Sequence, residues 1–168
     1  RALDGAVPLL QQMTYMIALG IGGEEALTLW AMTSGWGASA LVFVISRRYL
    51  PLNWALAATL LFLTTPAVIY GAGSGQVEVR NAIFTLTSVF MAGEALVRRD
   101  SRFVVASGIA VGFFAASKYP GLIIALAVGI ALMPARGWFT RGLLFSAAFF
   151  IAAGQWYAWN WWNTGDPI

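Results

Sequence analysis

The chain has 168 residues, of which 60% are hydrophobic and 10% are charged, and its mean hydropathy is +0.74. Soluble domains usually carry about 25% charged residues, so this composition predicts an integral membrane protein. The formal net charge of +3 does not indicate nucleic-acid binding. The arginines stand at the ends of apolar runs, and no face of the chain alternates basic and aromatic residues.

The sequence contains no cysteine and no histidine. This excludes disulfides, thiolate chemistry and metal sites built from Cys or His, as well as haem or chlorophyll held by histidine. We therefore expect no such cofactor and no metal site. Carboxylates could still bind a divalent cation, but no motif in the sequence favours such a site.

Apolar runs between polar breaks predict the helices, because a bilayer core about 30 Å thick requires roughly 20 helical residues. A short interfacial helix is expected over residues 7–19 and ends at "GIGGEE". The expected spans are residues 25–46, 53–70, 77–97, 102–117, 120–133 and 138–159. The prediction is an all-α, polytopic membrane protein with about six transmembrane helices, forming a single domain over residues 1–168.

Three local features refine these helices. Pro66 falls late in the second span and should kink or end it. Gly108 and Gly112 lie four residues apart and would let another helix approach closely. Glu94 precedes Arg98 by four residues, a spacing that predicts an ion pair on one helix face.

The charges predict an orientation. Three alternate loops are basic, and they hold Arg47, Arg48, Arg98, Arg99, Arg102, Arg136 and Arg141. The positive-inside rule places these loops in the cytoplasm. The remaining loops, with Glu78, Arg80, Lys118 and Asp166, are then expected on the outer face.

Two residues on this outer face are candidates for function. Glu78 follows "GAGSG" and could act as a base or bind a cation, or it could simply be a carboxylate at a helix start. Lys118, in "AASKYPGL", could extend to lipid headgroups or bind a phosphate together with Tyr119. Pro120 suits the first helical position, which predicts that the amides after it are free to bind an anion.

Several stretches together resemble the membrane glycosyltransferases of the GT-C superfamily, in particular bacterial protein mannosyltransferases and lipid A aminoarabinose transferases. They are "ALAATLLFLTTPAVIYGAGSGQVEV", "VASGIAVGFFAASKYPGLI" and "QWYAWNWWNTGDPI", in this order, and "PLLQQMTYMIALGIGGEEALTLW" is similar to the family's juxtamembrane helix. The resemblance covers nearly the whole chain. It implies a bacterial inner-membrane enzyme that transfers a sugar from a polyprenyl-phosphate donor at the outer face.

The resemblance also implies roles and departures. Lys118, Tyr119 and Arg80 would bind the phosphate of the donor, and Glu78 would be a supporting acid or base. The family's main catalytic carboxylate lies in an earlier outer loop, and Asp4 lacks its acidic-aromatic context. Trp159 replaces an arginine of the family pattern. We therefore expect a piece of a longer protein that does not catalyse alone.

Two functions follow as hypotheses. The first is a glycosyltransferase-like protein whose partners are membrane lipids and the lipid-linked sugar. The alternative is an inactive accessory subunit packed against other membrane subunits. A transporter is less favoured, because no inverted repeat and no charge in the middle of a predicted span is visible.

Overall fold

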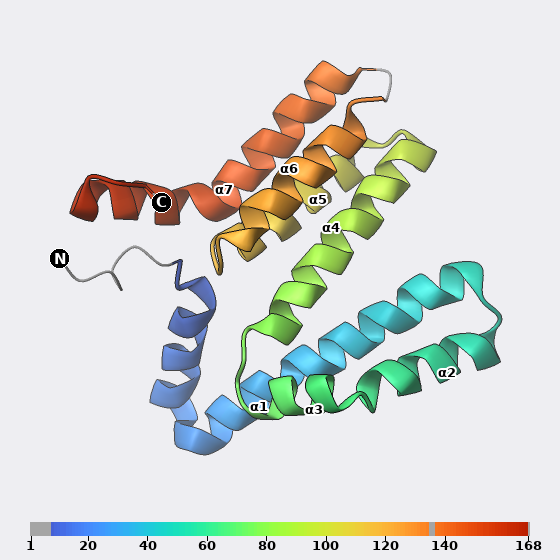
Figure 1. Ribbon diagram of the computed structural model, residues 1–168, viewed down its shortest axis with the longest axis vertical. Coiled ribbons are helices and arrows are strands. Elements are labelled where there is room, and N and C mark those ends of the chain that lie inside the picture. Colours follow the sequence, from blue (N-terminus) through green and yellow to red (C-terminus); the bar gives the residue numbers. More distant parts are fainter. Residues whose placement is uncertain (1–7, 135–136, 168) are drawn as a thin grey trace. The chain divides into compact units, whose positions relative to one another are not determined.

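The computed structural model describes residues 8–134 and 137–167. These residues form seven α-helices, which confirms the all-α class (Figure 1). The helices are α1 (Leu10–Tyr49), α2 (Leu52–Leu63), α3 (Pro66–Gly73), α4 (Glu78–Arg98), α5 (Ser101–Ala115), α6 (Pro120–Leu132) and α7 (Trp138–Thr164). Asp4 and Arg136, which the sequence analysis weighed, lie outside the described residues.

The chain divides into two compact units. The N-terminal unit comprises residues 11–83, and the C-terminal unit comprises residues 84–168 together with residues 1–10. The first turns of α4 belong to the N-terminal unit and the rest of this helix to the C-terminal unit. The prediction of a single domain over residues 1–168 stays a prediction.

In the N-terminal unit, α1 is bent at Gly22 and Gly23, whose backbone is not helical. Gly23 has a φ of 64°, a left-handed conformation that glycine adopts without the steric cost of a Cβ. The sequence predicted a break at this point between two separate helices. The structure confirms this break, since the backbone of Gly22 and Gly23 is not helical and Glu24 and Glu25 begin the second limb of α1.

Pro66 has the effect that the sequence predicted. It begins α3, and α2 ends at Leu63, so the two helices meet at an angle of 60°. The hydroxyl groups of Thr64 and Thr65 donate to the carbonyls of Leu60 and Leu61, at 2.7 and 2.8 Å. These bonds give both side-chain hydroxyls a hydrogen-bond partner within their own helix turn.

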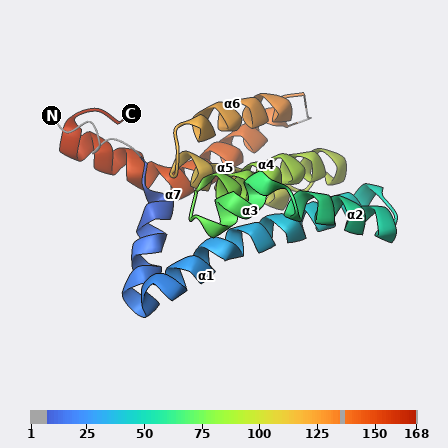
Figure 2. The same ribbon diagram turned by 60° about the horizontal axis from the view of Figure 1, so that its bottom comes forward.

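The C-terminal unit is built around α5, which packs against both α6 and α7 (Figures 1 and 2). A Cβ added to Gly108 would lie 2.9 Å from Ala148 Cβ, and one added to Gly112 would lie 2.7 Å from Ala152 Cβ. The two glycines therefore let the backbone of α5 approach α7, as their spacing predicted. The core around this contact includes Val104, Val111, Ala115, Val128, Leu132, Phe145 and Phe149.

Within the same unit, α4 is tied to α5 by two serines. Ser88 and Ser107 are fully buried, and the Ser107 hydroxyl donates to the Ser88 carbonyl at 2.8 Å. At the end of α4, Arg98 forms the predicted ion pair with Glu94. Asp100 then caps α5 by accepting from the backbone amide of Arg102 at 2.8 Å.

The prediction of about six transmembrane helices is wrong for the described residues. In this part of the chain only α1 is a helix long and apolar enough to cross a membrane, and the bent pair of α2 and α3 is a second candidate if it counts as one span. With 15 and 13 residues, α5 and α6 reach only about 23 and 20 Å at 1.5 Å per residue.

The two remaining long helices fail for a different reason. Charged residues lie near both ends of α4, and amides such as Gln155 and Asn160 interrupt the apolar sequence of α7. The prediction of a multi-pass path is therefore not supported. The cytoplasmic placement of the basic loops was derived from that path and stays a prediction.

Candidate functional site

Lys118 and Tyr119 lie at the corner where α5 ends and α6 begins, in the C-terminal unit. Both side chains are half-buried. The backbone amide of Lys118 donates to the Phe114 carbonyl at 2.9 Å, and the Ser117 hydroxyl donates to the Phe113 carbonyl at 2.7 Å. The end of α5 thus fixes the backbone that carries the only lysine of the chain.

The amides that follow Pro120 are not free. Pro120 does begin α6, as predicted. However, Gly121 N donates to the Lys118 carbonyl at 3.0 Å, and Leu122 N donates to the Tyr119 carbonyl at 2.9 Å. The prediction of free amides for an anion is therefore wrong at these two positions. Any anion bound at the corner would depend on the side chains of Lys118 and Tyr119.

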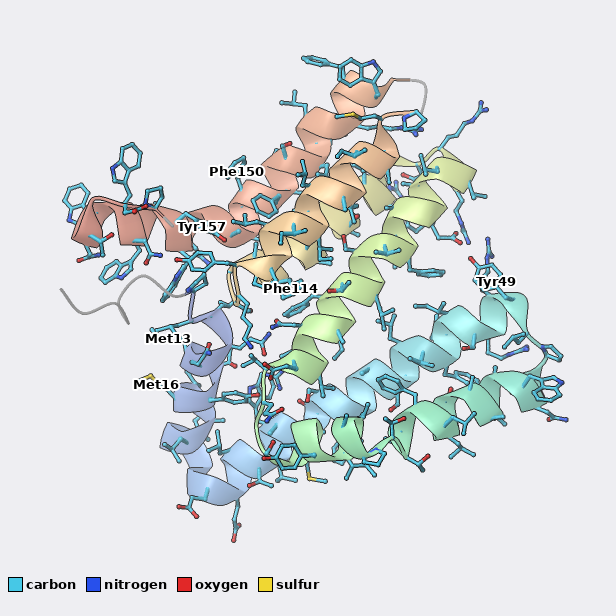
Figure 3. All side chains as sticks on the ribbon, in the orientation of Figure 1. Met13, Met16, Tyr49, Phe114, Phe150 and Tyr157 are labelled. Atoms are coloured by element: carbon cyan, nitrogen blue, oxygen red, sulfur yellow. The ribbon has the colours of Figure 1, made fainter. Side chains whose placement is uncertain are left out.

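Two residues from the second half of α7 and its end contribute to this corner. The Tyr157 hydroxyl donates to the Ala115 carbonyl at 2.9 Å, which joins α7 to the last turn of α5 (Figure 3). Burial, and to a lesser degree Tyr119, raises the pKa of Tyr157 to about 12. Burial, followed by the Asp166 carboxylate, raises the pKa of Tyr119. Both phenols therefore stay protonated at neutral pH, so the Tyr119 hydroxyl can donate a hydrogen bond.

Asp166 lies in the turn that follows α7. Gly165 ends α7 with a φ of 74°. The Thr164 hydroxyl donates to the Asp166 carbonyl at 2.8 Å, and the Asp166 amide donates to the same hydroxyl oxygen at 3.1 Å. This turn fixes the backbone of Asp166, whose negative charge contributes to the raised pKa of Tyr119.

A second polar site, which the sequence analysis did not predict, surrounds Arg80 in the N-terminal unit. We call it the Arg80 cluster; its members are Gln11, Thr14, Tyr15, Trp30, Thr33, Arg80 and Asn81. The Arg80 guanidinium donates to the Trp30 carbonyl at 2.7 Å. Its carbon lies 4.5 Å from the centroid of the Trp30 ring and 5.4 Å from that of Tyr15.

The Arg80 cluster joins both limbs of the bent helix α1. Thr14 belongs to the first limb and Trp30 to the second, and the Trp30 indole donates to the Thr14 hydroxyl at 3.0 Å. Arg80 contacts both residues. In the part of the chain that the structure describes, the hydrogen-bond partners of its guanidinium are all uncharged oxygen atoms. Burial lowers the pKa of Arg80, the direction expected for a desolvated cation.

The buried amide of Gln11 donates to the Asn81 side chain, which fixes α1 against the start of α4. Within residues 8–134 and 137–167, the carbonyl oxygen of the same Gln11 amide and the Tyr15 hydroxyl have no hydrogen-bond partner. Gln11, Thr14 and Tyr15 share one face of α1 by their spacing of three and four residues. This polar face in an apolar helix is the sequence signal that could have revealed the cluster.

The four residues that the sequence singled out fall into two pairs. Glu78 and Arg80 lie in the first turn of α4 in the N-terminal unit, whereas Lys118 and Tyr119 lie in the C-terminal unit. Glu78 is exposed, and its place at the start of α4 agrees with the reading as a helix-start carboxylate. Within the described residues no group of three or more Asp or Glu could hold a metal ion.

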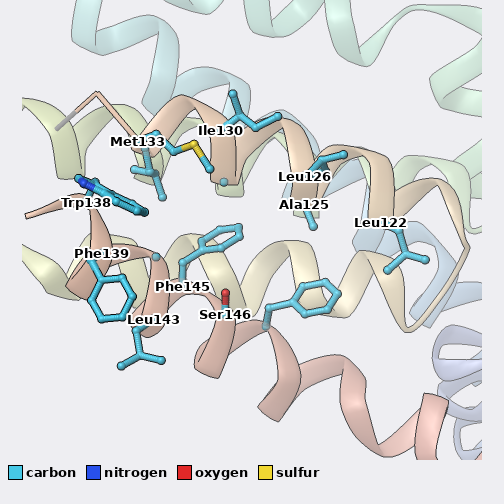
Figure 4. Close-up of a pocket in the computed structure, with 14 residues that line it drawn as sticks. Leu122, Ala125, Leu126, Ile130, Met133, Trp138, Phe139, Leu143, Phe145 and Ser146 are labelled. Atoms are coloured by element: carbon cyan, nitrogen blue, oxygen red, sulfur yellow. The ribbon is translucent and has the colours of Figure 1, made fainter.

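An apolar groove of about 550 Å³ runs between α6 and α7 (Figure 4). The lining on the first side comes from α6 and the residue after it: Leu122, Ala125, Leu126, Gly129, Ile130, Leu132 and Met133. The lining on the other side comes from α7: Trp138, Phe139, Gly142, Leu143, Phe145, Ser146 and Phe149. Its lining on α6 begins four residues after Lys118.

Comparison with protein-family models, with curated proteins and with solved structures gave no match for this chain.

Proposed function

We propose that this chain is a glycosyltransferase-like protein of the bacterial cytoplasmic membrane that binds a polyprenyl-phosphate sugar donor at the corner between α5 and α6. The observation that carries the proposal is the half-buried pair of Lys118 and Tyr119 at the start of a helix whose next residues are apolar. A lipid with one anionic group and a hydrocarbon chain could place the anion at the Lys118 ammonium group and the chain along the apolar residues of α6.

The chemistry of the corner supports a phosphate. Lysine is a compact cation with rotatable donors, and it binds phosphate as a point charge. The Tyr119 hydroxyl adds one donor, because a tyrosine side chain is protonated at neutral pH and burial raises the pKa of this one further. Since the amides of Gly121 and Leu122 bond within the turn, the ammonium group of Lys118 supplies the main attraction. Its removal should therefore weaken binding of the phosphate strongly.

Glu78 and Arg80 would contribute less to binding of the donor than Lys118 does. Glu78 is exposed and would be a supporting acid or base for transfer of the sugar. The Arg80 guanidinium is buried and bonded to α1. A contact between Arg80 and the donor phosphate would require these bonds to open, so its main role in the proposal is to hold the N-terminal unit together.

The test is donor binding by the Lys118→Ala variant. The protein is reconstituted in nanodiscs of zwitterionic lipid and titrated with decaprenyl phosphate. We expect Lys118→Ala to weaken binding by about tenfold, the loss of about 1.4 kcal/mol that fits one charge-assisted hydrogen bond. Arg141→Ala, which removes another partly exposed cation at the start of α7, is the matched control and should bind as the wild type does. Equal binding by the wild type and Lys118→Ala would exclude the proposed role.

One observation favours the alternative of an accessory subunit. Large apolar side chains are exposed on every described helix except α5, among them Ile21, Leu61, Val97, Ile123 and Trp162. Exposed apolar area of this kind indicates contact with lipid or with other proteins. A native mass that shows other subunits at fixed stoichiometry, together with absence of decaprenyl-phosphate binding, would favour this function over the transferase.

A further inference from the structure

The end of the C-terminal unit that lies opposite the Lys118 corner is basic and exposed. It consists of the end of α4, the start of α5 and the start of α7, which Figures 1 and 2 both show at one end of this unit. We call it the arginine end; its cations among the described residues are Arg98, Arg99, Arg102 and Arg141. The Lys118 corner lies at the other end of α5, about 23 Å away for 15 residues at roughly 1.5 Å each.

The packing of α5 on α7 brings Arg102 and Arg141 to the same level. A Cβ added to Gly108 or Gly112 would lie 2.9 or 2.7 Å from the Cβ of the α7 residue forty positions later. The two helices therefore run parallel in a fixed register. Extending this register back by less than two turns sets Arg102 level with the position after Arg141.

The end of α4 is fixed to the start of α5, which brings two more arginines to this end. The Arg98 guanidinium carbon lies 5.3 Å from the centroid of the Phe103 ring, and the Asp100 carboxylate accepts from the backbone amide of Arg102 at 2.8 Å. Glu94, which pairs with Arg98, is buried. Within the described residues the arginine end therefore presents four guanidinium groups and two carboxylates, one of which is buried.

Arg99 has a backbone conformation that disfavours arginine. It follows the last residue of α4, and with a φ of 57° it is the one non-glycine residue of positive φ in the described part of the chain. Its amide donates to the Ala95 carbonyl at 3.0 Å, an ending for which helices usually use glycine. An L side chain in this conformation costs free energy. Since the Arg99 side chain is exposed, packing does not account for it, and strain at such a position points to function.

Aromatic and apolar side chains flank these cations. Trp138 and Phe139 begin α7 and are 55% and 70% exposed, with ring centroids 5.9 Å apart. Val97, in the last turn of α4, is also exposed. Tryptophan is enriched at membrane–water interfaces, where its ring lies at the level of the headgroups. Arginine near a membrane is attracted to anionic lipids, so this combination of side chains fits a lipid surface.

We propose that the arginine end binds the headgroups of anionic phospholipids, with Trp138 and Phe139 at the boundary between headgroups and hydrocarbon. Charge complementarity selects this partner, because guanidinium groups outnumber carboxylates here and bind phosphate through paired donors. An acidic protein surface is the competing partner, and it would not require the aromatic flank. This binding is independent of the proposed polyprenyl-phosphate site, since Lys118 lies beyond the other end of α5.

The first experiment compares two lipids. The protein in dodecyl maltoside micelles is titrated with phosphatidylglycerol that carries a pyrene group on one chain, or with phosphatidylcholine labelled in the same way, and energy transfer from tryptophan reports binding. We expect the wild type to bind phosphatidylglycerol at least about fivefold more tightly, the effect of one arginine near a lipid surface. The difference should shrink as salt rises. Equal affinity would overturn the proposal and favour an acidic protein as the partner.

Arg99→Gly removes one cation without straining the fold. Glycine adopts a φ of 57° more readily than arginine does, so the variant should be at least as stable as the wild type in chemical unfolding. We expect it to weaken phosphatidylglycerol binding by about fivefold and to leave phosphatidylcholine binding unchanged. Unchanged phosphatidylglycerol binding, or an equal loss for both lipids, would overturn the proposal.

Lys118→Ala is the matched control, because it also removes one cation of the C-terminal unit, but at the other end of α5. Adding Arg99→Gly to this variant should still lower the affinity for phosphatidylglycerol by about fivefold. An effect of Arg99→Gly that disappears in the Lys118→Ala protein would place the lipid at the corner and overturn the proposal. If decaprenyl phosphate does not bind but phosphatidylglycerol behaves as expected, the proposed function fails and the role of the arginine end is supported.

Discussion

Arg80 is a buried cation whose hydrogen-bond partners in the described residues are neutral. Burying a charge in this way costs free energy of folding unless other interactions compensate for it. In α1 the compensating contacts stabilise the bend, because the guanidinium contacts Thr14 before the bend and Trp30 after it. The sequence placed Arg80 in an outer loop with Lys118. Its true surroundings depend on contacts between residues about fifty positions apart, which no local pattern shows.

Replacing Arg80 by glutamine should destabilise the N-terminal unit. The variant loses a charge-assisted hydrogen bond to Trp30 and two cation–π contacts. We expect a loss of about 2–4 kcal/mol in the free energy of unfolding. Faster hydrogen exchange in both limbs of α1 would show it. Arg48→Gln, at an exposed position in the last turn of the same helix, is the control and should change little. An unchanged exchange rate in Arg80→Gln would contradict the role of Arg80 in the bend.

The raised pKa of Tyr157 makes the stability of the folded chain depend on pH at alkaline values. Its pKa is raised from 10.0 to about 12, so between these values the unfolded chain loses the phenolic proton while the folded chain keeps it. Tyr157 therefore makes the folded state lose stability as pH rises through this window. We expect Tyr157→Phe to flatten the fall of stability between pH 10 and about 12. Below this window the variant should be less stable by about 0.5–1.5 kcal/mol, for the lost bond to Ala115. Parallel stability–pH curves for the two proteins would contradict the assignment.

At the scale of the elements, the sequence located most helices closely. The predicted residues 102–117 became α5 (Ser101–Ala115), and residues 120–133 became α6 (Pro120–Leu132). The start of α6 was located from Pro120, which suits the first helical position. The bounds of α5 followed from its apolar run, and in the structure Asp100 caps the start of this helix. The break at "GIGGEE" was also located, because glycines readily adopt the non-helical backbone that Gly22 and Gly23 have in α1.

The corner itself depends on a glycine. A Cβ on Gly121 would lie 2.5 Å from the Cα of Ala115, too close for real atoms. We expect Gly121→Ala to lower the free energy of unfolding by about 1–3 kcal/mol, the usual cost of overpacking, and to weaken decaprenyl-phosphate binding by moving Lys118. Gly142→Ala, where a Cβ meets no atom within 4 Å, should raise the free energy of unfolding by up to about 1 kcal/mol, because alanine is the better helix former. Chemical unfolding of both variants provides the comparison, and equal stability would show that the corner can relax.

For the whole molecule, the continuous apolar runs predicted the all-α class correctly, but they did not give the number of spans. A mean hydropathy of +0.74 counts apolar residues without regard to helix length. The described apolar residues are divided among short helices such as α2, α5 and α6, with 12, 15 and 13 residues. The sequence located Lys118 and Tyr119, but it could not place Tyr157 beside them, since that neighbour depends on the packing of α7 on α5.

We propose that the C-terminal unit recognises the phosphate of a polyprenyl lipid. The most direct measurement compares decaprenyl phosphate with decaprenol, the uncharged alcohol of the same chain, in binding to the wild-type protein in zwitterionic nanodiscs. We predict that the phosphate binds at least about tenfold more tightly, a difference of about 1.4 kcal/mol, and that the difference shrinks as salt rises. Equal affinity for the two lipids at low salt would show that the C-terminal unit does not recognise the phosphate.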